Sequence, residues 1–394
     1  MMKKGSLPLR GTRVIELSHM VMGPSAGLVL ADLGATVIKI EPPGGDKTRL
    51  LKGSGAGYFT MYNRNKHSVC VDLKSTEGRD IVLDLIKEAD VLVENFRNGT
   101  MDKLGLGYAA ASALNPRLIY CSARGFLRGP YEHRTALDEV TQMMGGLAYM
   151  TGPPGQPLRA GASVVDVMGG MFGVIGILAA LEQRHSTGKG QHLSSSLYES
   201  TAFLVGQHMA QMAVLGEPAQ PMPTRISAWA VYDIFKSSEG ESVFVAVVSD
   251  GQWQTFCKTF DLGDIGSDPA LATNAARVAA RDRIIPRVSE VLQQHSKDEL
   301  MRALDDCGLP YAPIARPQDL FDDPHLVESG GLLPVTTVNG NPTHLPALPV
   351  EMNGDRLGVR KDVPTPGQDT DTVLREMGLS AEDIARLREQ NIVS

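Results

Sequence analysis

Residues 13–40 read RVIELSHMVMGPSAGLVLADLGATVIKI, and this stretch decides the fold. Residues 13–17 and 36–40 are short β-rich runs, and each predicts a strand. Residues 24–33 predict a helix between them, because proline suits a first helical turn and Gly34 follows the last one. A strand, a helix and a strand in this order are the building block of a parallel sheet covered by helices.

The same alternation continues along the first third of the chain. Residues 68–73, 90–94 and 117–122 predict further strands, because they are rich in β-branched and apolar residues and end at polar loops. Residues 76–88 predict a helix that begins at Thr76 as its capping residue. We therefore expect the α/β fold class.

A long, apolar helix is predicted at residues 163–182, and a second one at residues 197–215. Four glycines and an alanine of the first helix lie roughly on one flank: Gly169, Gly170, Gly173, Gly176 and Ala180. A glycine inside a helix costs about 1 kcal/mol relative to alanine, so several together indicate close approach by a neighbouring helix or backbone.

The composition changes at a proline-rich stretch, residues 216–223, which predicts a linker. We expect a large domain at residues 1–215, a linker at 216–225, a small α+β domain at 226–325, and a linker with the C-terminal part of the large domain at 326–394. Strands near residues 230–235 and 242–248 and helices near 253–259, 283–294 and 297–307 would form the small domain. Two helices are predicted at residues 371–377 and 381–390.

Composition excludes several functional classes. A chain of 394 residues with a formal net charge of −7 has no overall basic footprint for nucleic acid. We expect no secretory signal and no membrane span, since the longest apolar run, residues 167–181, is short for a bilayer. The four cysteines are scattered without a CxxC pair, which favours reduced thiols and a cytoplasmic location.

The common cofactor motifs are missing from the sequence. It contains no GxGxxG, no GxxxxGK[ST] and no HExxH pattern. We therefore expect no permanently bound cofactor and no metal.

Asp166 stands at the head of the glycine-rich helix and has two interpretations. An aspartate there can cap the helix by accepting backbone N–H bonds. It can also be a carboxylate nucleophile, kept ionised by the positive helix end and surrounded by small residues that leave room for a substrate. The residues alone favour the cap.

Cations follow the predicted strands, where open α/β sheets bind ligands. They are Lys47, Arg49, Arg64, Lys66, Lys74, Arg97, Lys103 and Arg124. Such a set suits phosphate groups, although a solvated face would account for about half of them.

Six collinear blocks of the sequence resemble the CaiB/BaiF (class III) CoA-transferase family. They are RVIELSHMVMGPSAGLVLADLGATVIKIEPPGGD (13–46), NRNKHSVCVDLKSTEG (63–78), ADVLVENFRNGTMDKLGLGY (89–108), NPRLIYCSARGF (115–126), GILAALEQRHSTGKGQHL (176–193) and GQDTDTVLREMG (367–378). The resemblance implies a large Rossmann-like domain made of both chain ends, with a smaller domain between them. It also implies a ring-shaped chain in an interlocked homodimer.

The resemblance further implies covalent chemistry at Asp166, with CoA and acyl-CoA as substrates. The matching aspartate in the family attacks the thioester of a donor acyl-CoA to give a mixed anhydride, which CoA thiolate converts to an aspartyl-CoA thioester. A small carboxylic acid then attacks this thioester and finally receives CoA. Such a site must exclude water, because anhydrides hydrolyse readily.

Several CoA contacts follow from the same match. His19, Val21 and Met22 would lie near the pantetheine, and Tyr58 and Asp138 would line the acyl site. The remaining CoA candidates are Val71, Asp72, Leu73, Lys74, Asn95, Phe96, Arg97, Lys103 and Arg124. Pro42 replaces an arginine that some formyl-CoA transferases place beside the adenine.

Departures from the family pattern narrow the substrate. Val21 replaces a glutamine of formyl-CoA transferases, and no glycine-rich active-site loop is found in the matching region, so we expect a bulkier acyl group with succinyl-CoA as a candidate donor. The alternatives are a 2-methylacyl-CoA racemase and a non-catalytic CoA-binding protein. Leu137 argues against the racemase, whose catalytic histidine directly precedes the aspartate matching Asp138.

Overall fold

A computed structural model describes residues 7–225 and 227–394 of the chain. The chain divides into two compact units. The first consists of Met1–Pro223 with Pro324–Ser394, and the second of Thr224–Asp323. The N-terminal and C-terminal parts of the described chain therefore belong to one unit, which also contains every candidate site residue.

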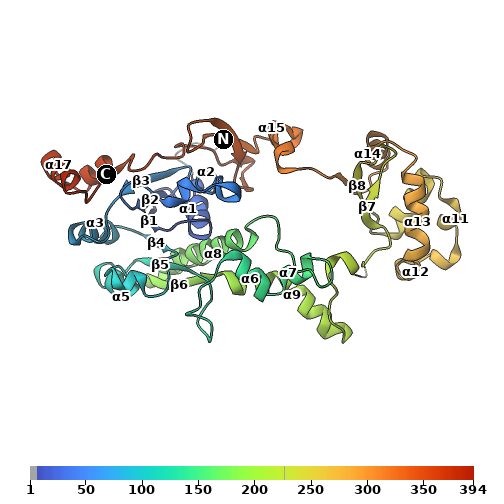
Figure 1. Cartoon of the computed structure of the whole chain (residues 1–394), viewed down its shortest axis with the longest axis horizontal. Helices are drawn as coiled ribbons and strands as arrows, with labels where there is room; N and C mark the ends of the chain where they lie inside the picture. Colours follow the sequence, from blue (N-terminus) through green and yellow to red (C-terminus); the bar gives the residue numbers. More distant parts are fainter. Residues whose placement is uncertain (1–6, 226) are drawn as a thin grey trace. The chain divides into compact units, whose positions relative to one another are not determined.

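The first unit is built on a six-stranded parallel sheet in the order β3-β2-β1-β4-β5-β6 (Figure 1). The strands are β1 (Arg13–Leu17), β2 (Thr36–Glu41), β3 (Lys66–Cys70), β4 (Val91–Glu94), β5 (Ile119–Arg124) and β6 (Gln191–Ser196). This is the doubly wound order, in which the chain direction across the sheet reverses beside β1. The predicted α/β class is confirmed.

Alternate residues of the strands face two different hydrophobic layers. On one face, Val14 and Val37 pack against Leu30 of helix α1 (Met22–Asp32) and Ile177 of helix α8 (Val164–Thr187). The opposite face of the sheet, to which Ile15 belongs, is covered by α3 (Thr76–Lys87), α5 (Tyr108–Leu114), α16 (Thr370–Glu376) and α17 (Ala381–Glu389). Period-two burial on both faces is what the β-rich runs of the sequence require.

Other elements complete the first unit. They are α2 (Tyr58–Tyr62), α4 (Thr100–Lys103), α6 (Asp138–Met144), α7 (Leu147–Thr151), α9 (Leu197–Leu215), α15 (Pro324–Glu328), and the short antiparallel pairs β10 (Leu332–Thr336) with β11 (Pro342–Pro346) and β12 (Glu351–Met352) with β13 (Asp355–Arg356). The second unit has an antiparallel sheet of β7 (Tyr232–Lys236), β8 (Ser242–Ala246) and β9 (Tyr311–Pro313), with α10 (Asp250–Thr259), α11 (Gly263–Gly266), α12 (Asn274–Ala279), α13 (Arg281–Leu292) and α14 (Lys297–Asp306). Trp253 and Phe256 are fully buried in the core of that unit.

Two local predictions need correction. The capping residue of α3 is Ser75, not Thr76, because the Ser75 hydroxyl accepts the Gly78 N–H at 2.9 Å. Strand β6 was not predicted, since its sequence QHLSSS is polar and lies at the sheet edge, where apolar alternation is not needed.

The glycine flank of α8 allows the close approach that the sequence predicted. A Cβ atom on Gly170 would lie 2.1 Å from Ser25 Oγ and 2.6 Å from the Met22 carbonyl oxygen of α1.

Helix α8 is longer than the apolar run counted in the sequence, and by length and composition alone it is able to cross a membrane. In this structure its flank packs on α1 and its Gly173 faces Ser195 of β6.

We expect Gly170→Ala to destabilise the first unit by about 2 kcal/mol, because the added methyl group meets backbone atoms that cannot rotate away. Urea unfolding followed by circular dichroism would measure this. Gly206→Ala is the matched control, since no heavy atom lies within 4 Å of its added Cβ in α9. The control should be stabilised by up to about 1 kcal/mol, and equal effects in both variants would contradict the close-packing argument.

Candidate active site

A cavity of about 320 Å³ opens at the carboxyl ends of β1, β4 and β5. Loops that leave β1 and β4 supply His19, Val21 and Asn95 to its wall, and the last residue of β5 supplies Arg124. Open α/β sheets bind ligands at this edge, at the point where the strand order reverses. The predicted nucleophile Asp166 and both predicted acyl-site residues, Tyr58 and Asp138, line the cavity, as does Met22, a predicted pantetheine contact.

Asp166 is the third residue of α8 and does not cap it. The cap position belongs to Ser163, whose side chain makes no capping hydrogen bond. Asp138 performs this role from helix α6: its Oδ2 accepts the N–H groups of Val165 at 3.0 Å and Asp166 at 3.1 Å. Within the described residues, the Asp166 carboxylate accepts no hydrogen bond, so it is available to a ligand in the cavity.

The protonation of Asp166 differs from the expectation drawn from the helix end. Burial raises the pKa of Asp166 to about 7, and the negative charge of Asp138 adds to the effect, while Arg159 opposes it. The positive end of α8 therefore does not keep Asp166 fully ionised at neutral pH, because the buried carboxylate Asp138 already occupies the helix amides. A carboxyl group with a pKa near the working pH is typical of catalytic sites.

A second cavity, of about 300 Å³, adjoins the ends of β2 and β3. Six of the predicted CoA contacts line it: His19, Val71, Asp72, Leu73, Lys74 and Phe96. His19 lines both cavities, and its ring meets the ring of Phe96 edge-on at 5.8 Å. The two cavities thus share a wall, which suits one elongated ligand with an apolar middle part.

Two predicted CoA contacts lie outside both cavities. Arg97 follows β4 and Lys103 ends α4, and both side chains are exposed. The structure does not bring these two residues together with Asp166. Pro42 does line the second cavity, where it adds apolar surface but no charge.

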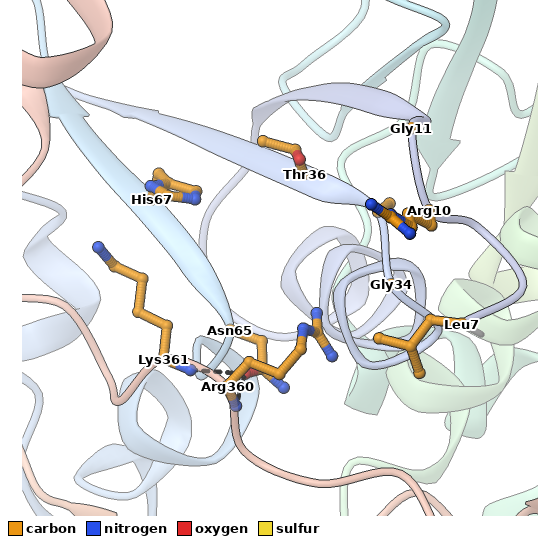
Figure 2. A pocket seen from close by; sticks show the side chains of 10 residues that line it. Leu7, Arg10, Gly11, Gly34, Thr36, Asn65, His67, Arg360 and Lys361 are labelled. Carbon is orange, nitrogen blue, oxygen red and sulfur yellow. Dashed lines mark hydrogen bonds between the residues drawn. The ribbon is translucent and has the colours of Figure 1, made fainter. Parts of the chain in front are cut away.

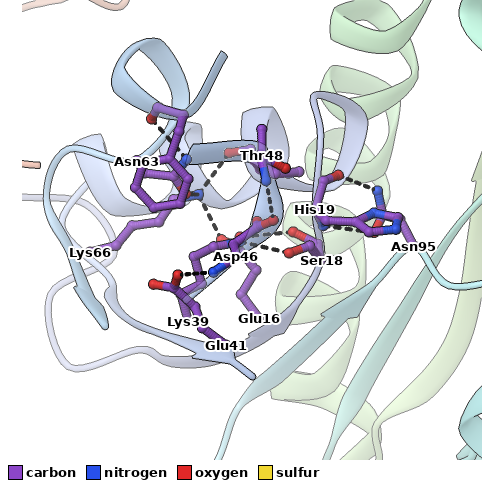
Figure 3. Close-up of polar contacts among 12 residues, drawn as sticks. Glu16, Ser18, His19, Lys39, Glu41, Asp46, Thr48, Asn63, Lys66 and Asn95 are labelled. Carbon is purple, nitrogen blue, oxygen red and sulfur yellow. Dashed lines mark hydrogen bonds and ion pairs between the residues drawn. The ribbon is translucent and has the colours of Figure 1, made fainter. Parts of the chain in front are cut away.

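Buried ion pairs hold the loop that carries His19, Met20 and Val21 (Figure 3). Lys39 Nζ donates to the Ser18 carbonyl oxygen at 2.6 Å and pairs with Glu16 and Asp46, each at 3.3 Å. Both Glu16 and Lys39 are completely buried. Removing one partner of such a network leaves an unpaired buried charge, which is strongly destabilising.

Side-chain hydrogen bonds fix the same loop from two other sides. Asn95 accepts the His19 N–H at 3.0 Å and donates to the His19 carbonyl at 2.8 Å, and the Thr48 hydroxyl accepts the Met20 N–H at 3.1 Å. Met20 has a φ of +65°, a left-handed conformation that costs free energy in a residue with a side chain. The surrounding contacts therefore hold a strained loop in one conformation at the junction of the two cavities.

The predicted set of loop cations separates into groups. Lys66 and Arg64 are buried in pairs with Glu16 at 2.8 Å and Asp32 at 2.7 Å, and Arg49 pairs with Glu41 at 2.7 Å. Burial lowers the pKa of Lys66 to about 8 despite Glu16. The phosphate role predicted for these three residues is therefore wrong. Lys47 and Lys74 line the second cavity and Arg124 the first.

Arg159 and Glu139 also line the first cavity, and sequence reasoning missed both. Arg159 forms an ion pair with Glu139 and lies 4.0 Å from Asp138. It sits in the loop PPGQPLRAG, which has no periodicity that would place a side chain. The only feature of the sequence that could have pointed to Arg159 is its position seven residues before Asp166.

A separate cavity, of about 400 Å³, lies at the amino ends of β2 and β3 (Figure 2). Asn65 Oδ1 accepts the backbone N–H groups of Arg360 at 2.6 Å and Lys361 at 3.0 Å beside it. These bonds fasten the C-terminal segment to the sheet. None of the predicted site residues lies in this cavity.

Comparisons with known proteins agree with this geometry. The family model described as CoA-transferase family III matches residues 9–370. The chain belongs to CoA-transferase family III. The resemblance stated from the sequence blocks is thereby confirmed, and the protein is an enzyme of this family.

Two relatives and one solved structure show how far the similarity extends. The chain is 35% identical over 386 residues to a succinate–glutarate CoA-transferase of Agrobacterium fabrum, covering 94% of this chain and 96% of the relative. It is 30% identical over 377 residues to the human succinyl-CoA:glutarate CoA-transferase, covering 94% and 86%. A CaiB/BaiF family protein from Brucella suis superimposes with a TM-score of 0.82 at 34% identity, covering 94% of this chain and 99% of that structure.

The histidine that a racemase would use is absent from the described lining of this cavity, although the matching aspartate, Asp138, is present. Leu137, at the position where racemases carry histidine, lines the cavity and is exposed. His133 does not line the cavity; it pairs with Glu132 on the surface. Among the described residues, His19 is the histidine that lines the first cavity.

Proposed function

We propose that this enzyme transfers CoA from an acyl-CoA donor, with succinyl-CoA as the candidate, to a small carboxylic acid, through covalent intermediates on Asp166. One observation carries the proposal. The Asp166 carboxylate lies on the wall of a cavity without a hydrogen-bond partner among the described residues, and Asp138 takes over the capping that would otherwise engage it. The names of the relatives, which are succinyl-CoA:glutarate and related CoA-transferases, support the substrate class.

The chemistry follows from the environment of Asp166. The ionised carboxylate attacks the thioester carbonyl, the C–S bond breaks, and CoA leaves as thiolate while a mixed anhydride forms. The thiolate then attacks the Asp166 acyl carbon and releases the donor acid, which leaves an aspartyl-CoA thioester. Burial supports these steps, because a poorly hydrated carboxylate is the more reactive nucleophile and an anhydride survives only where water is excluded.

The two adjoining cavities suit the two halves of an acyl-CoA. The acyl group would enter the first cavity beside Asp166 and Tyr58, and CoA would extend past His19 into the second cavity with Lys47 and Lys74 at its wall. The loop of His19 and Met20, which hydrogen bonds hold in one conformation, would then position the thioester at the junction of the two cavities.

A single assay by mass spectrometry in D₂O tests this proposal. The enzyme would be given succinyl-CoA, a chiral 2-methylacyl-CoA and a panel of carboxylic acids. New CoA thioesters that depend on Asp166 would support the transferase. Incorporation of deuterium into the 2-methylacyl-CoA without new thioesters would show racemase chemistry and contradict the transferase. Binding of CoA without any turnover would indicate a binding protein.

The proposal includes a homodimer. Helices α8 and α9 expose apolar side chains that a soluble monomer rarely presents together: Met171, Ile175, Leu178, Phe203, Met209, Met212, Val214 and Leu215. A second copy of the chain is the partner that we propose for this face. Sedimentation equilibrium should give twice the chain mass, and Phe203→Glu, at a side chain that is 71% exposed, should lower the stability of the dimer in urea unfolding. A wild-type monomer would contradict the proposal.

We also place the enzyme in the cytoplasm. All four cysteines are free thiols, which is the state that a reducing compartment maintains.

A further inference from the structure

The cavity that holds Asp166 has one arginine with a weakly held guanidinium. Three residues able to carry a positive charge line this cavity, namely His19, Arg124 and Arg159. Arg124 is committed to structure: it pairs with the buried Glu94 at 2.5 Å, and it donates to the Phe96 carbonyl at 2.7 Å and the Ser122 hydroxyl at 3.0 Å. Its charge is therefore already balanced.

Arg159 is held much more loosely. Its Nε donates to the Ala160 carbonyl at 3.0 Å, and its Nη1 pairs with Glu139, a side chain that is 59% exposed. Its Nη2 lies 4.0 Å from Asp138 Oδ1, which is too far for a hydrogen bond. Because an ion pair with an exposed carboxylate contributes only about 0–1 kcal/mol, a ligand carboxylate can replace Glu139 at small cost.

We infer that Arg159 binds the unreacted carboxylate of a dicarboxylic acid, so that short dicarboxylic acids are the substrate class. This inference rests on the proposed function. A planar guanidinium recognises a carboxylate with two parallel hydrogen bonds, which gives orientation as well as affinity. An arginine bound to the far carboxylate leaves the near carboxylate unpaired and nucleophilic beside Asp166.

The acidic residues of the cavity make such a cation necessary. Asp138, Glu139 and Asp166 all line the space that an acid substrate would enter. Like charges at short range in a poorly solvated site repel strongly, so a dianion needs a counter-charge there. Arg159 is the arginine of this wall that a ligand can engage, because its partner Glu139 is exposed and the buried Asp138 lies beyond hydrogen-bond distance.

The covalent step itself improves binding of the acid. Conversion of Asp166 to its CoA thioester removes one negative charge from the wall. The near carboxylate of the acid then attacks the thioester carbon, the C–S bond breaks, and thiolate leaves with the electron pair. Thiolate attack on the substrate side of the resulting anhydride releases the Asp166 carboxylate and the new acyl-CoA. The acid should therefore bind the thioester form more tightly than the free enzyme.

Kinetics with matched acids test the assignment. For Arg159→Gln, we expect the KM for glutarate to rise about 10- to 100-fold, the loss expected for one charged hydrogen-bonded pair, while the KM for valerate stays within about 2-fold. Arg128→Gln is the control, because this exposed arginine lines neither cavity. Equal changes for glutarate and valerate would overturn the assignment.

Glu139→Gln should act in the opposite direction. Removing the competing carboxylate leaves Arg159 more available, so the KM for glutarate should fall about 2- to 5-fold, in line with a weak surface pair. Such a gain does not arise from damage to the fold. A KM for glutarate that rises in this variant would also overturn the assignment.

A binding measurement separates this inference from the proposed function. Asp166→Asn imitates the neutral thioester form, so calorimetry should detect glutarate binding to this variant saturated with CoA. The double variant with Arg159→Gln should lose that binding. If both variants bind glutarate equally, the carboxylate site is wrong whether or not the wild type turns over. If the wild type transfers no CoA but binding depends on Arg159, only the proposed function fails.

Discussion

Replacing Asp166 by alanine will abolish CoA transfer. We expect kcat to fall by on the order of 10⁴-fold or more, because loss of a nucleophile removes the covalent path rather than weakening one contact. Transfer from succinyl-CoA to glutarate, followed by mass spectrometry, measures the loss. CoA binding should change little, since none of the residues that line the second cavity is altered.

Glu139→Gln is the matched control for this prediction. Glu139 is a neighbouring carboxylate on the same cavity wall, but it is exposed and paired with Arg159, so we expect it to keep turnover. Trapping provides direct evidence: hydroxylamine added during turnover should convert Asp166 to a hydroxamate, which peptide mapping locates. Turnover within about 10-fold of wild type in Asp166→Ala would exclude the covalent path, because a nucleophile cannot be replaced at such small cost.

The sheet could be predicted because its signal is local. Residues 13–17 and 36–40 carry β-rich runs, and the structure places strands β1 and β2 there within one residue. Strand β6 has no such signal because its residues are polar and its pairing with β5 depends on a partner far along the chain. Periodicity reports burial, so a polar edge strand is not visible to it.

The site could be predicted only in part, because its geometry is made by long-range contacts. The sequence pointed to Asp166 but left open whether this residue caps α8 or acts as a nucleophile. The structure decides against the cap, because Asp138, 28 residues away in the chain, accepts the hydrogen bond from the Asp166 N–H group. Similarly, Lys66 and Glu16 form a buried pair between two strands, and nothing in either local sequence shows it. Charge pairing across a fold requires the fold to be known first.

The pH dependence of the reaction will show an acid limb near neutrality. Because the pKa of Asp166 is raised to about 7, only about one molecule in a hundred carries the ionised nucleophile at about pH 5. We therefore expect kcat/KM for succinyl-CoA to rise about 100-fold between about pH 5 and pH 8. An unperturbed aspartate would give a flat profile over this range, which would contradict the assignment.

Asp138→Asn tests the cause of that limb. The amide oxygen of asparagine can still accept an N–H group of α8, but it removes the negative charge that raises the Asp166 pKa. The limb should therefore move to lower pH. It should not disappear, because burial is the larger cause of the shift.

The same pKa shift predicts how stability depends on pH. The folded-state pKa of Asp166 lies above its ordinary value of 3.8, so the folded protein binds the proton more tightly than the unfolded chain. The resulting stabilisation is fully present below about pH 4 and is lost as the pH rises through about 7. Asp166→Asn, which cannot ionise, should therefore be more stable than the wild type by on the order of 4 kcal/mol at about pH 8 and by less than about 2 kcal/mol at about pH 5. Urea unfolding at the two pH values measures this difference, and groups that titrate in both proteins cancel from it. An equal difference at both pH values would mean that Asp166 is not buried as a proton-binding group, and the pH limb would then need another origin.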